Sequence, residues 1–320
     1  MSNKIRMKQN IKYFILQISL VWIVFQSNAQ QDPQYTQYMY NMSVINPAYA
    51  IGDTDLLNLG ALYRTQWVGS VGGPTTGTFF AHVPLTEKVE IGGSIVHDQI
   101  GDVVKETNVF VDFAYIININ ATSKLSFGIK GGFSAFSTVF DGFVYSDELP
   151  DPAFANNLSK VFPNVGVGAY YFGENYYVGL SSPNLIESKH LESEDGIVVT
   201  GVEEIHYFFT GGYVFDLNEN LKFKPAFMMK SALGAPVSLD LTSNFLINSK
   251  VELGVGYRWD DAVCGLINFK ILPTLRVGYA YDYTISNLGK FNSGSHEVMI
   301  LFDLDKSAKQ KGYDKSPRFF

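Results

Sequence analysis

The segment Lys124–Phe136 reads KLSFGIKGGFSAF, and its apolar and polar residues alternate. One face of an extended chain would carry Leu125, Phe127, Ile129, Gly131, Phe133 and Ala135. The other face would carry Lys124, Ser126, Gly128, Lys130, Gly132 and Ser134. Because successive side chains of a β-strand point to opposite faces, this period of two predicts a strand. The alternation alone fits both a soluble β-sandwich and a membrane barrel.

The same period recurs along most of the chain. It is clear in LLNLGALYRTQW at 56–67, in LKFKPAFMMK at 221–230 and in VELGVGYRW at 251–259. Aromatic residues make up 15% of the chain, and no stretch after residue 29 holds 18 consecutive apolar residues. Such a chain can span a membrane only as a closed barrel, because the edge of an open sheet leaves peptide groups unpaired in lipid.

The lengths of the connections favour the barrel over the sandwich. We predict fourteen strands, at about 56–68, 75–83, 89–98, 106–118, 124–137, 164–172, 175–181, 204–214, 221–230, 236–246, 250–259, 262–270, 274–284 and 295–303. The even connections are all short, whereas the odd ones include the long loops near 138–163, 182–203 and 285–294. Short turns at one rim and long loops at the other are typical of outer-membrane barrels.

We therefore predict an all-β, transmembrane, antiparallel up-and-down β-barrel of about 14 strands, with both termini periplasmic. The charged residues expected on the inward, polar faces are Asp112, Lys124, Lys130, Lys222, Lys224, Lys230, Asp240, Glu252, Arg258, Arg276, Asp282 and Glu297. Because their signs are mixed, they either pair across a filled lumen or line a wet channel. The single cysteine, Cys264, excludes an internal disulfide.

The first 29 residues have the three parts of an export signal. A basic lead is followed by a mostly apolar run at 14–25, and Ser27–Ala29 provides small residues for cleavage. We expect the mature chain to begin at Gln30. Removing residues 1–29 removes four of the 24 basic residues and none of the 31 acidic ones, which leaves a net charge of −11. A chain this acidic is an unsuitable partner for nucleic acid.

Fragments that resemble catalytic motifs fail on inspection. HEVMI at 296–300 starts like a zinc-protease helix, but Ile300 stands where the second histidine is required. The glycines of GVGAYYFG at 166–173 are spaced by two and do not match a phosphate-binding loop. His82, His97, His206 and His296 fall on separate predicted strands with no accompanying nucleophile. We expect no enzyme activity, no cofactor and no metal site.

Several unusual motifs occur in order along the chain. They are QDPQYTQYMYN at 31–41, INPAYA at 45–50, YRTQW at 63–67, PNVGVGAYY at 163–171, YYVGLSSPNL at 176–185, VGYAYDYT at 277–284, GSHEVMI at 294–300 and SPRFF at 316–320. Together they resemble the PorP/SprF family of outer-membrane proteins associated with type IX secretion and gliding motility. Residues of these motifs expected in the lumen or marking the family are Arg64, Trp67, Asp282, Tyr283, His296 and Glu297.

The resemblance implies a Bacteroidetes-type cell envelope and a barrel in the outer membrane. It also implies a non-enzymatic role in secreting or anchoring a partner protein, such as a surface adhesin. The implied partners are outer-membrane lipid, the secreted surface protein and periplasmic components of the type IX machinery. The alternative function is a passive channel, or a channel for a lipophilic solute, because fourteen-stranded barrels also serve as transporters of hydrophobic compounds.

The predicted organisation has four parts. Residues 1–29 are the signal peptide, 30–54 a periplasmic arm or lumen plug, 55–303 the barrel and 304–320 a basic periplasmic tail. The arm carries the expected partner-binding residues Pro33, Tyr35, Tyr38, Tyr40, Asn46, Pro47 and Tyr49, and the tail carries Pro317, Arg318, Phe319 and Phe320. Tyrosine and methionine suit adaptable contact surfaces. The arm is therefore expected either to plug the lumen or to dock on a periplasmic partner.

Overall fold

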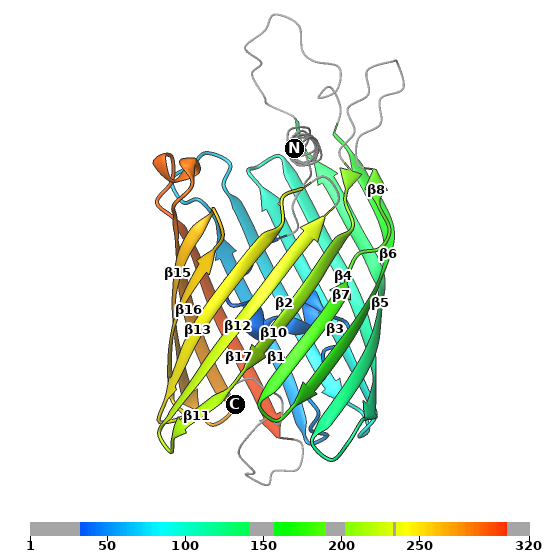
Figure 1. The fold of residues 1–320 in the computed structure, drawn as a ribbon. Helices are drawn as coiled ribbons and strands as arrows, with labels where there is room; N and C mark the ends of the chain where they lie inside the picture. Colours follow the sequence, from blue (N-terminus) through cyan, green and yellow to red (C-terminus); the bar gives the residue numbers. More distant parts are fainter. Residues whose placement is uncertain (1–32, 141–156, 190–201, 233–234, 306–320) are drawn as a thin grey trace, which may run out of the picture.

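Apart from one short two-stranded pair, the strands form one antiparallel sheet that closes on itself (Figure 1). The computed structural model describes residues 33–140, 157–189, 202–232 and 235–305. Closure occurs because β1 (Leu56–Thr65) pairs with β2 on one side and with the last strand, β17 (Ser295–Asp305), on the other. A membrane barrel of this kind leaves no sheet edge in lipid.

The barrel has fourteen strand positions, as the sequence predicts. Between β1 and β17 they are β2 (Pro74–Pro84), β3 (Val89–Ile100), β4 (Val104–Asn118), β5 (Ser123–Thr138), β6 (Ser159–Gly173), β7 (Tyr176–Ser182), β10 (His206–Tyr213) with β11 (Phe215–Asn218), β12 (Leu221–Ala232), β13 (Ser238–Ile247), β14 (Val251–Arg258), β15 (Ala262–Leu272) and β16 (Leu275–Thr284). The segments β10 and β11 count as one strand position because both pair with β12.

The break between β10 and β11 has a local cause in the neighbouring strand. The sequence predicts an uninterrupted strand at 204–214, but pairing with β12 stops after Gly212 and resumes at Phe215. Pro225 lies on β12 at the interruption and has no backbone N–H to give to a ladder. On the other side of the strand the ladder with β7 continues, since the Val214 N–H donates to the Asn175 carbonyl oxygen at 2.7 Å.

Several strands, β2 to β7 and β12, extend further toward the long-loop rim than the sequence predicts, whereas β1, β10, β13 and β14 stop short of their predicted bounds there. The largest difference is β6, which begins at Ser159 and not at residue 164. Pro163 suggests a later start, yet it is tolerated because β6 pairs only with β5 before Val167. Parts of the two longest predicted loops, 141–156 and 190–201, lie outside the described residues. The pair β8 (Ser188–Lys189) and β9 (Val202–Glu203) flanks the second of them.

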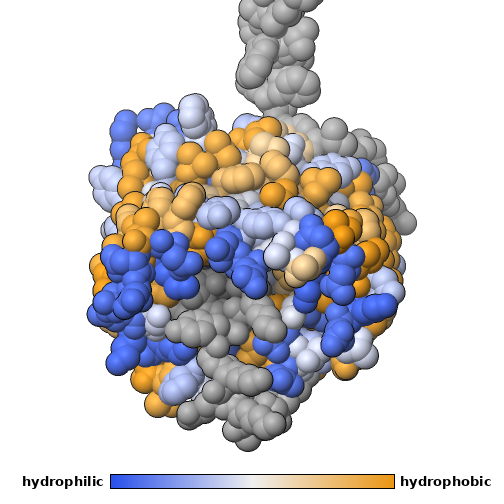
Figure 2. Space-filling view, turned by 60° about the horizontal axis from the view of Figure 1, so that its bottom comes forward, coloured by the Kyte–Doolittle hydropathy of each residue, from blue (hydrophilic) through white to orange (hydrophobic). Residues whose placement is uncertain are grey.

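The outer wall is apolar and the inner wall is polar. Outward residues of β5 include Phe127 and Ile129, which are 50% and 61% exposed, whereas the inward Lys130 is buried. Figure 2 shows hydrophobic residues over the outer wall and hydrophilic residues around the rim that faces the viewer. This distribution matches an outer face made for lipid. Within the described residues, no helix is long and apolar enough to cross a membrane.

The start of the first barrel strand and the end of the last one lie at the same rim, but the described part of the arm starts at the other rim. Leu56 pairs with Asp305 at the short-turn rim. Pro33, the first described residue, lines a cavity together with Ile100 and Val104. Ile100 ends β3 and Val104 begins β4, so both lie at the long-loop rim. The described part of the arm therefore begins at the long-loop rim, and the expectation that both termini are periplasmic stays a prediction. The arm folds back through the lumen before it reaches β1 (Figure 1).

A charge on the outer wall tests the lipid-facing assignment. We expect Ile129→Arg to reduce the free energy of unfolding by about 2–4 kcal/mol, because an arginine near the membrane midplane lies in hydrocarbon. Val71→Arg is the control, since Val71 is fully exposed in the β1–β2 turn. Guanidinium unfolding in lipid vesicles, followed by tryptophan fluorescence, gives both values. Equal stabilities for the two variants would contradict the assignment.

Candidate functional site

The candidate site is the lumen, which the arm fills. The arm contains a 3-10 turn, η1 (Tyr38–Tyr40), and one turn of α-helix, α2 (Met42–Ile45). After α2, Pro47 cannot continue the helix, and the Asn46 side chain accepts a hydrogen bond from the Ala48 N–H at 2.9 Å. The buried apolar residues of the arm are Tyr35, Tyr38, Met39, Tyr40, Met42, Ile45, Ala48, Tyr49, Ala50 and Ile51. Together with inward barrel residues they form one hydrophobic cluster.

A carboxylate on β17 holds the start of the arm. Glu297 accepts hydrogen bonds from the backbone N–H groups of Thr36 and Gln37, at 2.9 and 2.8 Å. Arg64 lies beside it, with Nη1 3.3 Å from Glu297 and Nη2 2.8 Å from Asp282. The Thr36 hydroxyl donates to Asp282 at 2.7 Å. All of these groups are buried, so the arm and three strands share one charged network.

A second carboxylate holds the end of the arm near the short-turn rim. Glu90 accepts the backbone N–H groups of Ile51 and Gly52, each at 2.8 Å. The His82 ring Nε2 lies 2.7 Å from the same carboxylate. Lys124 donates to the Gly52 carbonyl oxygen at 3.2 Å. The arm is therefore fixed at both ends through its backbone, by Glu297 of β17 at its start and by Glu90 of β3 and Lys124 of β5 at its end.

Strands on other sides of the barrel hold the middle of the arm. Lys130 donates to the Val44 carbonyl oxygen at 2.7 Å, and Ser181 donates to the Ile45 carbonyl oxygen at 2.9 Å. Tyr40 donates to Glu252 on β14. Burial, followed by the nearby Glu252 charge, raises the pKa of Tyr40 well above its usual value. The phenol therefore stays protonated and keeps its role as a donor.

Two glycines let the arm approach the barrel wall closely. A Cβ atom added to Gly128 on β5 would lie 2.2 Å from the Pro47 carbonyl oxygen and 2.3 Å from the Ala48 nitrogen. A Cβ added to Gly168 on β6 would lie 2.1 Å from the Asn46 side-chain oxygen. Larger residues at these positions cannot coexist with the arm in its present place.

The inward charges pair within the filled lumen. Of the twelve predicted, Lys124 and Lys222 are partly exposed near the short-turn rim and the other ten are buried. Arg258 lies 2.7 Å from Asp240 and 3.3 Å from Asp282. Lys130 lies 3.7 Å from Asp112. Between the two arrangements that the sequence leaves open, the described residues favour pairing across a filled lumen over a wet channel.

The predicted site residues fall into three groups. Tyr35, Tyr38, Tyr40, Asn46, Pro47 and Tyr49 are buried in the lumen, and Pro33 is partly exposed at its mouth. Arg64, Asp282 and Glu297 come together in the network around Thr36. The third group, Trp67, Tyr283 and His296, does not join them. Pro317, Arg318, Phe319 and Phe320 lie outside the described residues.

Each member of the third group has its own surroundings. Trp67 begins the β1–β2 turn, with a backbone φ of 50°. Tyr283 is 61% exposed on the outer wall. His296 also faces outward, and its ring Nδ1 lies 2.7 Å from the Tyr279 hydroxyl. Alternation along the strands explains this result, because Tyr283 and His296 are neighbours in sequence of the inward Asp282 and Glu297.

Sequence reasoning missed Glu90 and His82 as contacts of the arm. Glu90 precedes Gly92 and Ser94 on the inward face of β3, so the period of two is the signal that could have identified it. The four histidines considered as candidates lie on β2, β3, β10 and β17. Among the residues described, no group of three or more histidine, cysteine, aspartate or glutamate side chains is arranged to hold a metal ion.

The family is identified by a match over most of the chain. A family described as the type IX secretion system membrane protein PorP/SprF matches residues 27–302. The chain belongs to the PorP/SprF family. It is a membrane β-barrel of type IX secretion, as its motifs predict. A comparison with curated proteins finds no match.

Solved structures of other barrels resemble this member of the PorP/SprF family in fold. A Pseudomonas aeruginosa FadL homologue has 11% identity and a TM-score of 0.49, over 82% of this chain and 94% of its own. The Ralstonia pickettii toluene transporter TbuX has 11% identity and a TM-score of 0.47, over 82% and 93%. The Acinetobacter baumannii outer membrane protein Omp33 has 8% identity and a TM-score of 0.44, over 79% and 100%.

A single methyl group on the inner wall tests the seating of the arm. We expect Gly128→Ala to displace the arm and to produce ion conductance in planar bilayers, because its Cβ would overlap the backbone at Pro47 and Ala48. The overlap should also lower stability by about 1–3 kcal/mol. Gly131→Ala is the matched control on the same strand, since no atom lies within 4 Å of a Cβ there. Unchanged behaviour of Gly128→Ala would contradict the observed path of the arm.

Arg64 provides a test of the charged network. We expect Arg64→Met to lower the free energy of unfolding by about 3–5 kcal/mol, because it leaves the buried Asp282 and Glu297 carboxylates without a shared cation. Arg64→Lys keeps the charge and should cost less. Denaturant midpoints in vesicles measure both. A loss for Arg64→Met no greater than that for Arg64→Lys would show that the charge is unimportant.

Proposed function

We propose that this protein is a plugged, non-enzymatic barrel that helps the type IX machinery to secrete a partner protein or to anchor it at the cell surface. The partner would be a large surface protein such as an adhesin. The observation that carries this proposal is the occupied lumen. Buried residues of the arm contact strands on several sides of the barrel, including β2, β3, β5, β7, β14 and β17.

Because the lumen is filled, we expect the protein to contact its partners at the outer surfaces of the barrel. A substrate path would have to cross the arm, which is fixed by Glu297 at one end and by Glu90 at the other. A protein that passes nothing through its lumen can still serve a secretion system by contacts at its two rims. Membership of the PorP/SprF family supports contacts with secretion components.

The two rims are proposed to face different compartments. Short turns of outer-membrane barrels lie in the periplasm and long loops lie outside the cell. On this basis Leu56 and Asp305 mark the periplasmic rim, where components of the machinery would bind. The long-loop rim, where the described part of the arm starts at Pro33, would contact the secreted partner. The channel for a lipophilic solute remains the competing function, and the plug counts against it.

Conductance separates the two functions. We expect the full chain in planar bilayers to give no steady conductance, whereas deletion of residues 33–52 should open a pore, because the arm supplies the side chains that fill the lumen. Steady conductance by the full chain would favour the channel. In cells, loss of the gene should abolish display of the partner adhesin, and display is measured by surface proteolysis of intact cells. Normal display in its absence would contradict the proposed role.

A further inference from the structure

Three neighbouring loops of the long-loop rim carry exposed apolar side chains. They are the β1–β2 loop at 66–73, the β14–β15 turn at 259–261 and the β16–β17 loop at 285–294, which includes the 3-10 turn η3 (Asn287–Lys290). The β16–β17 loop is the orange loop at the rim in Figure 1. The exposed apolar residues of the three loops are Val68, Val71, Trp259, Ile285, Leu288 and Phe291. We call this set of residues the platform.

Backbone hydrogen bonds join the three loops to one another. The Val68 N–H donates to the Gly294 carbonyl oxygen at 2.8 Å, and the Ser293 N–H donates to the Val68 carbonyl oxygen at 2.7 Å. The Ile285 N–H donates to the Asp261 carbonyl oxygen at 2.8 Å. The platform is therefore built on loops that hold each other in place. A surface ordered in this way loses little conformational freedom when a partner binds.

The platform lies beyond the part of the barrel that faces lipid. The last outward residues of β16 are Tyr279, Tyr281 and Tyr283, and rows of aromatic residues mark the membrane–water interface of a barrel. The β16–β17 loop follows Tyr283 and is bonded to the neighbouring loops, so its apolar side chains lie on the water side of these tyrosines. Phe291, for example, is 72% exposed. Acyl chains of the membrane therefore do not account for the platform.

The opposite wall of the barrel shows what this level usually carries. The outward residues near the long-loop ends of β3 and β4 are polar, and His97 pairs with Thr107 and Gln99 with Lys105 in the register. Polar side chains are expected where a wall rises into water. The platform departs from this pattern, and a group of exposed apolar side chains on a soluble surface usually marks a contact with another protein.

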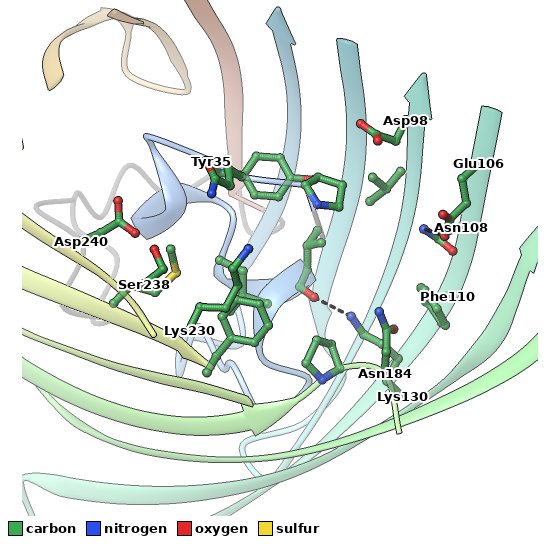
Figure 3. A pocket seen from close by; sticks show the side chains of 18 of the residues that line it. Tyr35, Asp98, Glu106, Asn108, Phe110, Lys130, Asn184, Lys230, Ser238 and Asp240 are labelled. Atoms are coloured by element: carbon green, nitrogen blue, oxygen red, sulfur yellow. Dashed lines mark hydrogen bonds between the residues drawn. The ribbon is translucent and has the colours of Figure 1, made fainter. Parts of the chain in front are cut away.

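The platform is separate from the cavity at the mouth of the lumen. That cavity has a volume of about 90 Å³, and its lining includes Lys130, Lys230 and Asp240 (Figure 3). None of the six platform residues lines it. A small solute in this cavity would therefore not touch the platform, which is a surface formed by loops and suits a larger partner.

The exposed charges beside the platform narrow the choice of partner. Asp260 in the β14–β15 turn is exposed and forms no ion pair within the part of the chain that the structure describes. Asp261 lies 3.4 Å from Arg258, and Lys290 is exposed at the end of η3. Two carboxylates in one turn disfavour the phosphates of a lipid headgroup. A protein surface can match both signs, with a basic group at Asp260 and an acidic group at Lys290.

We propose that the platform is the surface on which the secreted partner protein docks, through an apolar patch of its own that is bordered by a basic and an acidic group. Trp259 and Phe291 supply the aromatic side chains that protein interfaces favour. This inference rests on the proposed function, because that function places a protein partner at the long-loop rim. It adds which loops bind the partner and the chemistry of the surface that they recognise.

Protection of an introduced cysteine tests the contact in intact cells. The variant is Val71→Cys, since Val71 is fully exposed and the Ser70 hydroxyl beside it donates to the Phe291 carbonyl oxygen at 2.6 Å. The natural Cys264 is buried. The probe is a polyethylene-glycol maleimide. We expect labelling to be at least about fivefold slower in cells that display the adhesin than in cells that lack its gene, because a bound partner excludes solvent from the contact.

Val139→Cys is the matched control, because Val139 is exposed after β5 on the other side of the rim. Its labelling should be equal in the two kinds of cell. Equal rates for Val71→Cys in the two kinds of cell would overturn the proposal.

The purified protein in lipid nanodiscs tests the other possible occupants. Without the partner, Val71→Cys should react as fast as Val139→Cys. Slow labelling of Val71→Cys would mean that the platform is already covered, and it would overturn the proposal. Rapid labelling in detergent would then identify lipid as the cover, disulfide-linked dimers would identify a second copy, and neither result would leave another part of the same chain.

Loss of one aromatic side chain tests the energetics of docking. We expect Phe291→Ser to reduce the adhesin displayed on the cell surface by about tenfold, as is typical of a central aromatic residue in an interface. Leu85→Ser is the control, since Leu85 is 56% exposed in the β2–β3 turn at the short-turn rim. Gel mobility before and after heating checks that both variants form a barrel. Normal display with Phe291→Ser would count against the platform.

The two proposals fail in different ways. If display of the adhesin requires the gene but Val71→Cys is not protected, the secretion role stands and the platform is the wrong surface. If display is normal without the gene, the secretion role itself fails.

Discussion

The need to satisfy peptide groups in lipid determines this structure. Hydrocarbon offers the backbone no hydrogen-bond partner, so the sheet must close, and β1 pairs with β17 to close it. Closure with fourteen strands creates a second problem, which is the space inside the barrel. An eight-stranded barrel is just narrow enough to be filled by its own side chains, and larger barrels enclose a cavity or a channel. Here a segment of the same chain fills the space.

Buried carboxylates hold that segment in a consistent way. Glu297 and Glu90 each accept two consecutive backbone N–H groups of the arm and also lie beside Arg64 or His82. Glu252 accepts hydrogen bonds from the Tyr40 hydroxyl and from two asparagine side chains. A buried charge is costly unless several donors surround it. Because the arm supplies some of these donors, the barrel charges and the arm depend on each other for their stability.

The alternation of residues was enough to predict the strands and the inward charges, and together with the sorting of short and long connections it predicted the closed barrel. It could not predict the route of the arm, because residues 33–52 have no regular period and their positions depend on donors and acceptors from distant strands. The period of two could have placed Glu90 on the inward face, but it could not identify its partners, Ile51 and Gly52, which come from another part of the chain. The break at Val214 was missed for a similar reason, since its cause, Pro225, lies on the neighbouring strand.

The route of the arm links the two rims of the barrel. Tyr35 and Val44 line a cavity at the long-loop end of the lumen, and the same segment ends at Gly52 on Glu90, near the opposite rim. One segment therefore fills the lumen and also lines the cavity at its mouth. An empty barrel of the same width would have neither feature, because both depend on the side chains that the arm supplies.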